Sequence, residues 1–277
     1  MAVVEGPFRV DRGGGVVLDG ESAGAGPEVL LLHGLTATRR YVLHGSRTLE
    51  RAGRRVIAYD ARGHGRSTPP ADPADYAYRP TLADDAVAVM DAAGAPDAVL
   101  MGQSMGSATA LAVAFTHPER VRGLVIVTPA HRGHPASDMT RWDALSEGLA
   151  TGGVDGFMAA IGEPRVPEKW RSSITTVVRQ RMERHEHPDG VAAALAAIPR
   201  TAAFDGVDAL RELRVPVLVV GSRDELDPDH PLAVAEEYAR VIPDCELVVE
   251  EPGESPLAWR GGTLSNTVLD FMTRRGI

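Results

Sequence analysis

The stretch from Ala98 to Gly106 constrains the fold of this chain more than any other. An apolar run over 98–101 leads into Gly102-Gln103-Ser104-Met105-Gly106, and an alanine-rich helical pattern follows directly. Such a run predicts a buried strand, and the pattern after it predicts a helix. A sharp strand-to-helix turn needs glycine on both sides of the serine, and it lifts the hydroxyl over the helix N-terminus. The pattern predicts a nucleophile at Ser104; an idle serine in a glycine-rich turn is the alternative.

Short apolar runs alternate with longer helical patterns along most of the chain. This alternation is typical of a parallel sheet with crossover helices, so the sequence predicts an α/β protein. With 277 residues the chain is long enough for one large domain of this kind. We expect strands near 16–18, 29–32, 56–59, 98–101, 124–127, 217–220 and 246–249, and helices near 46–52, 81–93, 106–116, 231–241 and 263–273.

One long segment interrupts this alternation. Residues 129–214 contain helical patterns near 139–149, 169–184 and 191–198, and no convincing strand pattern. The sequence therefore predicts an α/β core made of residues 1–128 and 215–277, with 129–214 inserted as a helical cap over one end of the sheet. The cap carries several large apolar residues, which predict either a medium-sized apolar ligand or simple packing onto the core: Trp142, Phe157, Met158, Trp170 and Met182.

Charge and cysteine content exclude several function classes. The net charge of −9 argues against binding to nucleic acid or to anionic membranes. The single cysteine, Cys245, excludes an intramolecular disulfide and a cysteine-based zinc site. The N-terminus lacks a basic region followed by an apolar stretch, and the longest apolar runs have strand length. We expect a cytoplasmic protein without metal or cofactor; nothing in the sequence predicts its oligomeric state.

Two further motifs accompany the turn at Ser104. A strand pattern ends in His33-Gly34-Leu35, and a loop reads Asp60-Ala61-Arg62-Gly63-His64-Gly65-Arg66-Ser67. The three motifs, in this order, resemble the α/β-hydrolase superfamily, and the resemblance covers the chain from about Val16 to Met272. It implies a mostly parallel sheet of the eight-stranded type with flanking helices and a helical cap.

The resemblance also implies roles for particular residues. The backbone N–H groups of Leu35 and Met105 would form the oxyanion hole, in which two preorganised donors accelerate acyl transfer by several orders of magnitude. His33 would be a structural turn residue, and His64 would have no catalytic role.

The acid of a catalytic triad is expected after the apolar run 215–221. The resemblance places it in the loop that begins Ser222-Arg223-Asp224. A buried carboxylate at this strand end would accept a hydrogen bond from an imidazole N–H and stabilise the imidazolium. Asp224 matches this position best and Asp227 is second, while a solvated turn before Pro231 is the alternative.

The chain departs from the family at the base. The family pattern after the last strand is Pro-Gly-x-Gly-His, whereas this chain reads Pro252-Gly253-Glu254-Ser255-Pro256, and no histidine follows His230. Losing the triad histidine costs on the order of 10⁴ to 10⁶ in rate. We therefore expect the loop at 253–256, or water, to fill the space between Ser104 and Asp224.

Three other histidines are candidates for a substitute base. His131 and His134 follow the predicted strand 124–127 at its carboxyl end, which is the functional end of an open α/β sheet. His230 lies six residues past Asp224, at the expected start of a helix. Glu254 is a further candidate.

The sequence leaves three functions open, because one fold supports many chemistries. The first is a serine hydrolase of small esters or related acyl compounds with a non-standard or missing base. The second is a non-catalytic protein that binds a small molecule in the same pocket, as the plant gibberellin receptor resembles a carboxylesterase without its triad histidine. The third is a cofactor-free lyase, isomerase or oxygenase.

Overall fold

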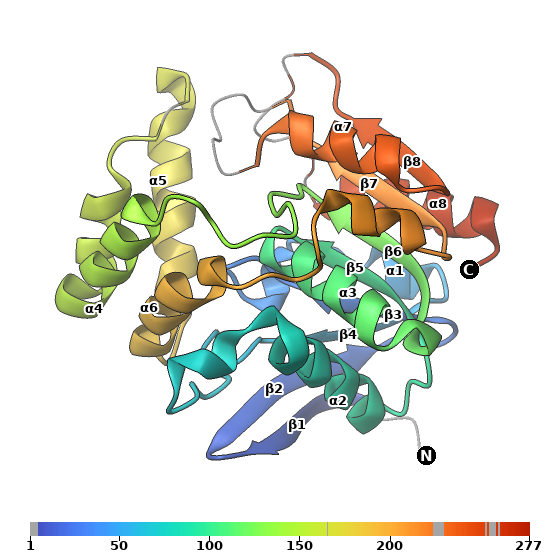
Figure 1. The fold of residues 1–277 in the computed structure, drawn as a ribbon, viewed down its shortest axis with the longest axis horizontal. Helices are drawn as coiled ribbons and strands as arrows, with labels where there is room; N and C mark the ends of the chain where they lie inside the picture. The colour runs from blue at the N-terminus through green and yellow to red at the C-terminus, as the bar shows by residue number, and fades with distance from the viewer. Residues whose placement is uncertain (1–4, 165, 224–229, 253, 255–258, 260) are drawn as a thin grey trace.

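An eight-stranded sheet forms the centre of the computed structural model, which describes residues 5–164, 166–223, 230–252, 254, 259 and 261–277 (Figure 1). The strand order is β1-β2-β4-β3-β5-β6-β7-β8. The pairs β1/β2 and β2/β4 are antiparallel, and every later pair is parallel, so the predicted α/β class and mostly parallel sheet are confirmed. The strands are β1 Gly6–Gly13, β2 Val16–Ala23, β3 Glu28–Leu32, β4 Arg55–Tyr59, β5 Ala98–Gln103, β6 Val121–Val127, β7 Val217–Gly221 and β8 Cys245–Val249.

The central strands are almost continuously apolar because helices cover both faces of the sheet. On one face Leu30 and Leu100 belong to a buried cluster that includes residues of α2, α3 and α7. On the other face Leu31 and Val99 belong to a second cluster with residues of α1 and α8. These helices are α1 Thr48–Arg51, α2 Ala83–Ala93, α3 Met105–Thr116, α7 Leu232–Val241 and α8 Gly261–Arg275. Single-turn helices connect several elements: η1 Arg39–Tyr41, η2 Pro73–Tyr76, η3 Tyr78–Leu82 and η4 Pro118–Arg120.

The sequence analysis missed β1. This edge strand is at most half-buried along its length, so it presents no apolar run. Its Phe8 ring lies across Gly20 of β2, where a Cβ would come within 2.8 Å of the ring. Cross-strand pairing and this ring contact therefore place β1, and neither is visible in a hydropathy pattern.

The described residues between β6 and β7 form helices and no strand. They contain α4 Thr140–Ile161, α5 Glu168–Met182, α6 Pro188–Ala197, η5 Ile198–Arg200 and η6 Val207–Glu212. Figure 1 shows α4, α5 and α6 grouped together to one side of the sheet. These helices share an apolar cluster of their own, which includes Leu149, Phe157 and Leu195. That separate cluster favours a cap, although the division at 129–214 stays a prediction. No described helix is both long enough and apolar enough to span a bilayer.

Candidate active site

Ser104 occupies a strained turn between β5 and α3. Its backbone has φ 52° and ψ −111°, a conformation that non-glycine residues rarely adopt. Two backbone hydrogen bonds hold this conformation: the Ser104 N–H donates to Val127 O at 3.0 Å, and Ser104 O accepts from the Ala108 N–H at 3.2 Å. The turn has the backbone geometry of a nucleophile elbow.

The glycines on either side of Ser104 are required by close backbone contacts. A Cβ on Gly102 would lie 2.1 Å from Gly106 O, and a Cβ on Gly106 would lie 2.0 Å from Leu32 O. Helix α3 can therefore begin directly against the ends of β5 and β3. The same packing brings the next loop beside the serine, because a Cβ on Gly34 would lie 3.5 Å from the Ser104 Cβ.

The loop after β3 is fixed through the carbonyl of Gly34. The Ala61 N–H donates to His33 Nε2 at 2.8 Å, so Nδ1 carries the proton and donates to Gly34 O at 2.8 Å. Gly34 O also accepts from the Ala37 N–H at 3.0 Å. These two bonds orient the peptide unit whose other end is the Leu35 N–H.

The two expected oxyanion donors have no other use in the described part of the chain. No described group accepts a hydrogen bond from the N–H of Leu35 or of Met105. Both residues lie next to the serine turn, Leu35 in the loop after β3 and Met105 at the first position of α3. Their role as an oxyanion hole stays a prediction that this geometry favours.

A histidine does reach the serine. His230 Nε2 lies 2.7 Å from Ser104 Oγ, although 126 residues separate the two in sequence. His230 is half-buried and precedes Pro231, the N-cap of α7. A neutral imidazole nitrogen at this distance can take the proton of the hydroxyl. Our expectation that only the loop at 253–256 or water lies beside Ser104 is wrong, because His230, the third of the candidate substitute bases, lies within hydrogen-bond distance of the hydroxyl.

The other candidate bases are used differently. His131 Nε2 accepts a hydrogen bond from the Ala203 N–H at 2.9 Å, and its ring packs between Tyr78 and Phe204 at centroid distances of 5.3 and 5.5 Å. Burial lowers the pKa of His131 to about 4. His131 therefore serves the fold, since the backbone already occupies its acceptor nitrogen.

The remaining two candidates lie at the surface. The side chains of His134 and Glu254 are exposed. No hydrogen bond between Ser104 Oγ and either residue is present in the described structure.

Both candidate acids, Asp224 and Asp227, lie outside the described residues, as do Gly253, Ser255 and Pro256 of the loop after β8. The sequence analysis missed a buried carboxylate close to that segment. Glu250 follows β8 and is only 4% exposed. Its Oε1 accepts from the Arg223 N–H at 2.6 Å and from Ser222 Oγ at 2.9 Å. Glu250 thereby anchors the beginning of the connection that ends at His230.

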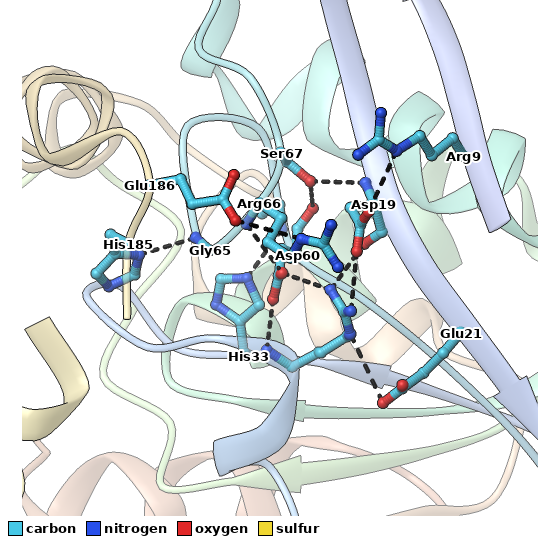
Figure 2. Close-up of polar contacts among 12 residues, drawn as sticks. Arg9, Asp19, Glu21, His33, Asp60, Gly65, Arg66, Ser67, His185 and Glu186 are labelled. Atoms are coloured by element: carbon cyan, nitrogen blue, oxygen red, sulfur yellow. Dashed lines mark hydrogen bonds and ion pairs between the residues drawn. The ribbon is translucent and has the colours of Figure 1, made fainter. Parts of the chain in front are cut away.

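An ionic network around Asp60 and Asp19 holds the loop 60–67 (Figure 2). The Asp60 carboxylate accepts from the backbone N–H groups of Arg39 and Arg66, at 2.8 and 3.2 Å, and pairs with the Arg39 guanidinium. Arg39 also pairs with Asp19 at 2.8 Å. Asp60 therefore ties the segment after the expected oxyanion loop to the loop 60–67.

His64, in the same loop, is fully buried. Its Nδ1–H donates to Arg62 O at 2.9 Å, and its ring centroid lies 5.1 Å from that of His33. Burial, and then the neighbouring His33 and His185, lower the pKa of His64 well below its ordinary value. Its surroundings are those of a neutral packing residue.

The described residues hold no cluster of three or more His, Cys, Asp or Glu side chains suited to a metal ion. A cavity of about 500 Å³ lies against β2, β3 and β4 and is lined by residues such as Arg40 and Ala58. Ser104 does not line it, so its volume carries no information about a substrate at the serine.

Comparisons with known proteins show which family this fold belongs to. The chain is 30% identical over 251 residues to the protein named "Putative carbamate hydrolase RutD" of Variovorax paradoxus (strain S110), covering 90% of this chain and 92% of that protein. A thermophilic esterase from Thermogutta terrifontis superposes with a TM-score of 0.77 at 26% identity, covering 97% of this chain and 98% of the esterase. The enol-lactonase from Burkholderia xenovorans LB400 has the same fold, with a TM-score of 0.76 at 23% identity over 96% of this chain and 99% of the lactonase. A family model described as "alpha/beta hydrolase fold" matches residues 27–259. This chain therefore belongs to the α/β-hydrolase fold family.

Proposed function

We propose that this protein is a serine hydrolase of small esters or related acyl compounds, with Ser104 as nucleophile and His230 as base. The observation that carries the proposal is the 2.7 Å contact between His230 Nε2 and Ser104 Oγ. A serine hydroxyl is a weak nucleophile unless an adjacent base takes its proton, and this contact supplies that base.

The proposed reaction follows from these positions. As Ser104 Oγ attacks the acyl carbon, His230 Nε2 accepts the hydroxyl proton, and the N–H groups of Leu35 and Met105 stabilise the negative charge on the carbonyl oxygen. His230 then gives the proton to the leaving alcohol, and a water activated by the same nitrogen hydrolyses the acyl-enzyme. For the carboxylate that orients the imidazole we propose Asp224, in the connection that also carries His230.

The contact at Ser104 favours a hydrolase over a non-catalytic binder, since the binder hypothesis depended on the absence of a histidine. The relatives are named for hydrolysis of a carbamate, an ester and an enol lactone, all of which contain an acyl carbon attached to oxygen. We propose a small substrate of this class. Half-buried Leu35, Trp142 and Met158 pack against the apolar cluster of α4–α6, which favours an apolar acyl group.

A fluorophosphonate probe tests the proposal directly. Intact mass spectrometry should show one covalent adduct on the wild-type protein and none on Ser104→Ala. His230→Ala should be labelled at least about 100-fold more slowly, because the hydroxyl has lost its base. His134→Ala, which removes an exposed histidine, is the matched control and should be labelled at the wild-type rate. An adduct at another residue, or equal labelling of wild type and His230→Ala, would contradict the proposal.

A further inference from the structure

A buried histidine between α5 and α6 contacts the loop that carries Leu35. His185 is 8% exposed, and the Gly65 N–H donates to its Nδ1 at 2.8 Å. Nδ1 is therefore the unprotonated nitrogen, and Nε2–H donates to Thr36 O at 3.1 Å. Figure 2 shows His185 beside Gly65 and Glu186. One imidazole thus joins the helical segment, the loop 60–67 and the expected oxyanion loop.

The bond to Thr36 fixes a peptide unit at both of its ends. His185 holds the carbonyl of Thr36, and the N–H of the same unit, which belongs to Ala37, donates to Gly34 O at 3.0 Å. Gly34 O in turn belongs to the peptide unit whose N–H is that of Leu35. His185 is therefore linked to the Leu35 N–H through two peptide units, Thr36–Ala37 and Gly34–Leu35, that are hydrogen-bonded to each other.

The loop needs such a tether because its backbone is strained. Thr36 has φ 69°, in the left-handed region that non-glycine residues avoid, and it is 7% exposed. A backbone in this region persists only when surrounding contacts hold it. The described contacts that do so are the turn from Ala37 to Gly34 and the bond from His185.

The position of His185 is itself well determined. The Glu186 N–H donates to Gly65 O at 2.8 Å, so two consecutive residues are bonded to Gly65. Burial is the main cause that lowers the pKa of His185 to about 4. The ring is therefore neutral near pH 7 and keeps one donor and one acceptor.

We propose that His185 is a positioning residue of the acyl-transfer site, through which the segment carrying α4–α6 orients the Leu35 N–H of the oxyanion hole. This inference rests on the proposed function, because it assigns a purpose to that N–H. His185 touches no reacting atom and acts only through the peptide units of Thr36 and Gly34.

Two conservative substitutions separate positioning from docking of the helical segment. The amide of Asn matches Nδ1, so His185→Asn keeps the acceptor for Gly65 and loses the donor to Thr36. The amide of Gln matches Nε2, so His185→Gln keeps the donor. Loss of one hydrogen bond that orients a transition-state donor is expected to lower kcat about tenfold in His185→Asn, with KM within about threefold of wild type. His185→Gln should recover most of this loss, and His187→Asn, nearby in the same turn, is the control.

A second readout reports on the oxyanion hole itself. Phenyl acetate and its thionoester, in which sulfur replaces the carbonyl oxygen, differ in how strongly the developing anion binds the hole. The kcat/KM for the oxygen ester divided by that for the thionoester should fall in His185→Asn and stay near the wild-type value in His185→Gln. Equal losses in both variants with an unchanged ratio would show that His185 only docks the helical segment, and unchanged kcat in His185→Asn would also overturn the proposal.

Hydrogen exchange distinguishes failure of this inference from failure of the proposed function. A peptide covering residues 34–41 should exchange the Ala37 amide faster in His185→Asn than in wild type or in His185→Gln. This measurement needs no turnover. If the wild-type protein shows no Ser104-dependent hydrolysis, the proposed function fails, and exchange alone decides whether His185 holds the loop. Equal exchange in all three proteins would overturn the inference.

Discussion

The two sides of the serine site are built in different ways. On the nucleophile side, one continuous stretch from Ala98 to Gly106 provides the strand, the turn and the start of the helix. Only glycine fits at 102 and 106, because a Cβ there would lie 2.1 and 2.0 Å from backbone oxygens. On the base side, His230 reaches Ser104 from 126 residues away, through the connection between β7 and α7. The first side is a local backbone constraint, and the second is a long-range contact.

This difference explains which expectations failed. A steric requirement between neighbouring residues leaves its mark on the sequence, because only glycine satisfies it. An imidazole can be delivered from any loop that ends at the same edge of the sheet, and the delivering loop need not be the one other family members use. The absence of a histidine after β8 was therefore a weak argument against a base.

The largest expected effect comes from removing either partner of the contact across the two sides. Ser104→Ala and His230→Ala should each lower kcat for p-nitrophenyl acetate by about 10⁴ to 10⁶, and the double variant should be no worse than the single ones, because the two groups act as a unit. Steady-state kinetics of the three variants check this. If the losses of kcat in the two single variants multiplied in the double variant, Ser104 and His230 would act independently, and the prediction would be contradicted.

The next effect tests the local constraint. Gly106→Ala places a Cβ 2.0 Å from Leu32 O, so backbone must move, and we expect destabilisation of about 3 kcal/mol or more, or failure to fold. Gly262→Ala is the matched control, because a Cβ there meets nothing within 4 Å in helix α8. It should be neutral or stabilise the fold by up to about 1 kcal/mol. Urea unfolding of both variants decides, and equal stabilities would refute the steric argument.

Acid should weaken the fold through its buried neutral histidines. Burial lowers the pKa of His131 and of His185 to about 4, whereas the ordinary value is 6.5. Between these values the unfolded chain binds more protons than the folded chain. The contribution of the two neutral histidines to the free energy of unfolding is therefore fully present above pH 6.5 and is lost as the pH drops toward 4. Each histidine should account for a loss on the order of 3 kcal/mol over this range. Urea midpoints should fall with pH accordingly, and less steeply in His185→Gln; a flat profile would contradict the buried neutral assignment.

The smallest effects distinguish two histidines that sequence reasoning treated alike. His131→Ala leaves the Ala203 N–H without its acceptor and opens space beside Tyr78, so we expect a loss of about 2 to 3 kcal/mol in unfolding free energy. His134→Ala changes an exposed side chain and should stay within about 0.5 kcal/mol of wild type. Turnover per folded molecule should be unchanged in both. A large loss of turnover in either variant would return that residue to the list of candidate bases.

The sequence by itself determined the features that depend only on residues close together along the chain. Alternating apolar and helical patterns gave the α/β class, and the glycine spacing around Ser104 gave a strained turn, since both rest on backbone sterics and burial that act over a few residues. The edge strand β1 escaped because pairing with β2 and the Phe8 contact place it, not an apolar run.

Only the tertiary structure decided which side chains meet. In the folded chain His230 lies beside Ser104, and the acceptor nitrogen of His131 is bonded to the Ala203 N–H. His185 donates to Thr36 O, although 149 residues separate the two in sequence. Nothing in the local sequence of these histidines separates them, because each is a polar residue near a loop or a helix end. Their roles follow from which hydrogen-bond partner the folded chain presents to each ring nitrogen, and that is a property of distances set by the packed sheet and helices.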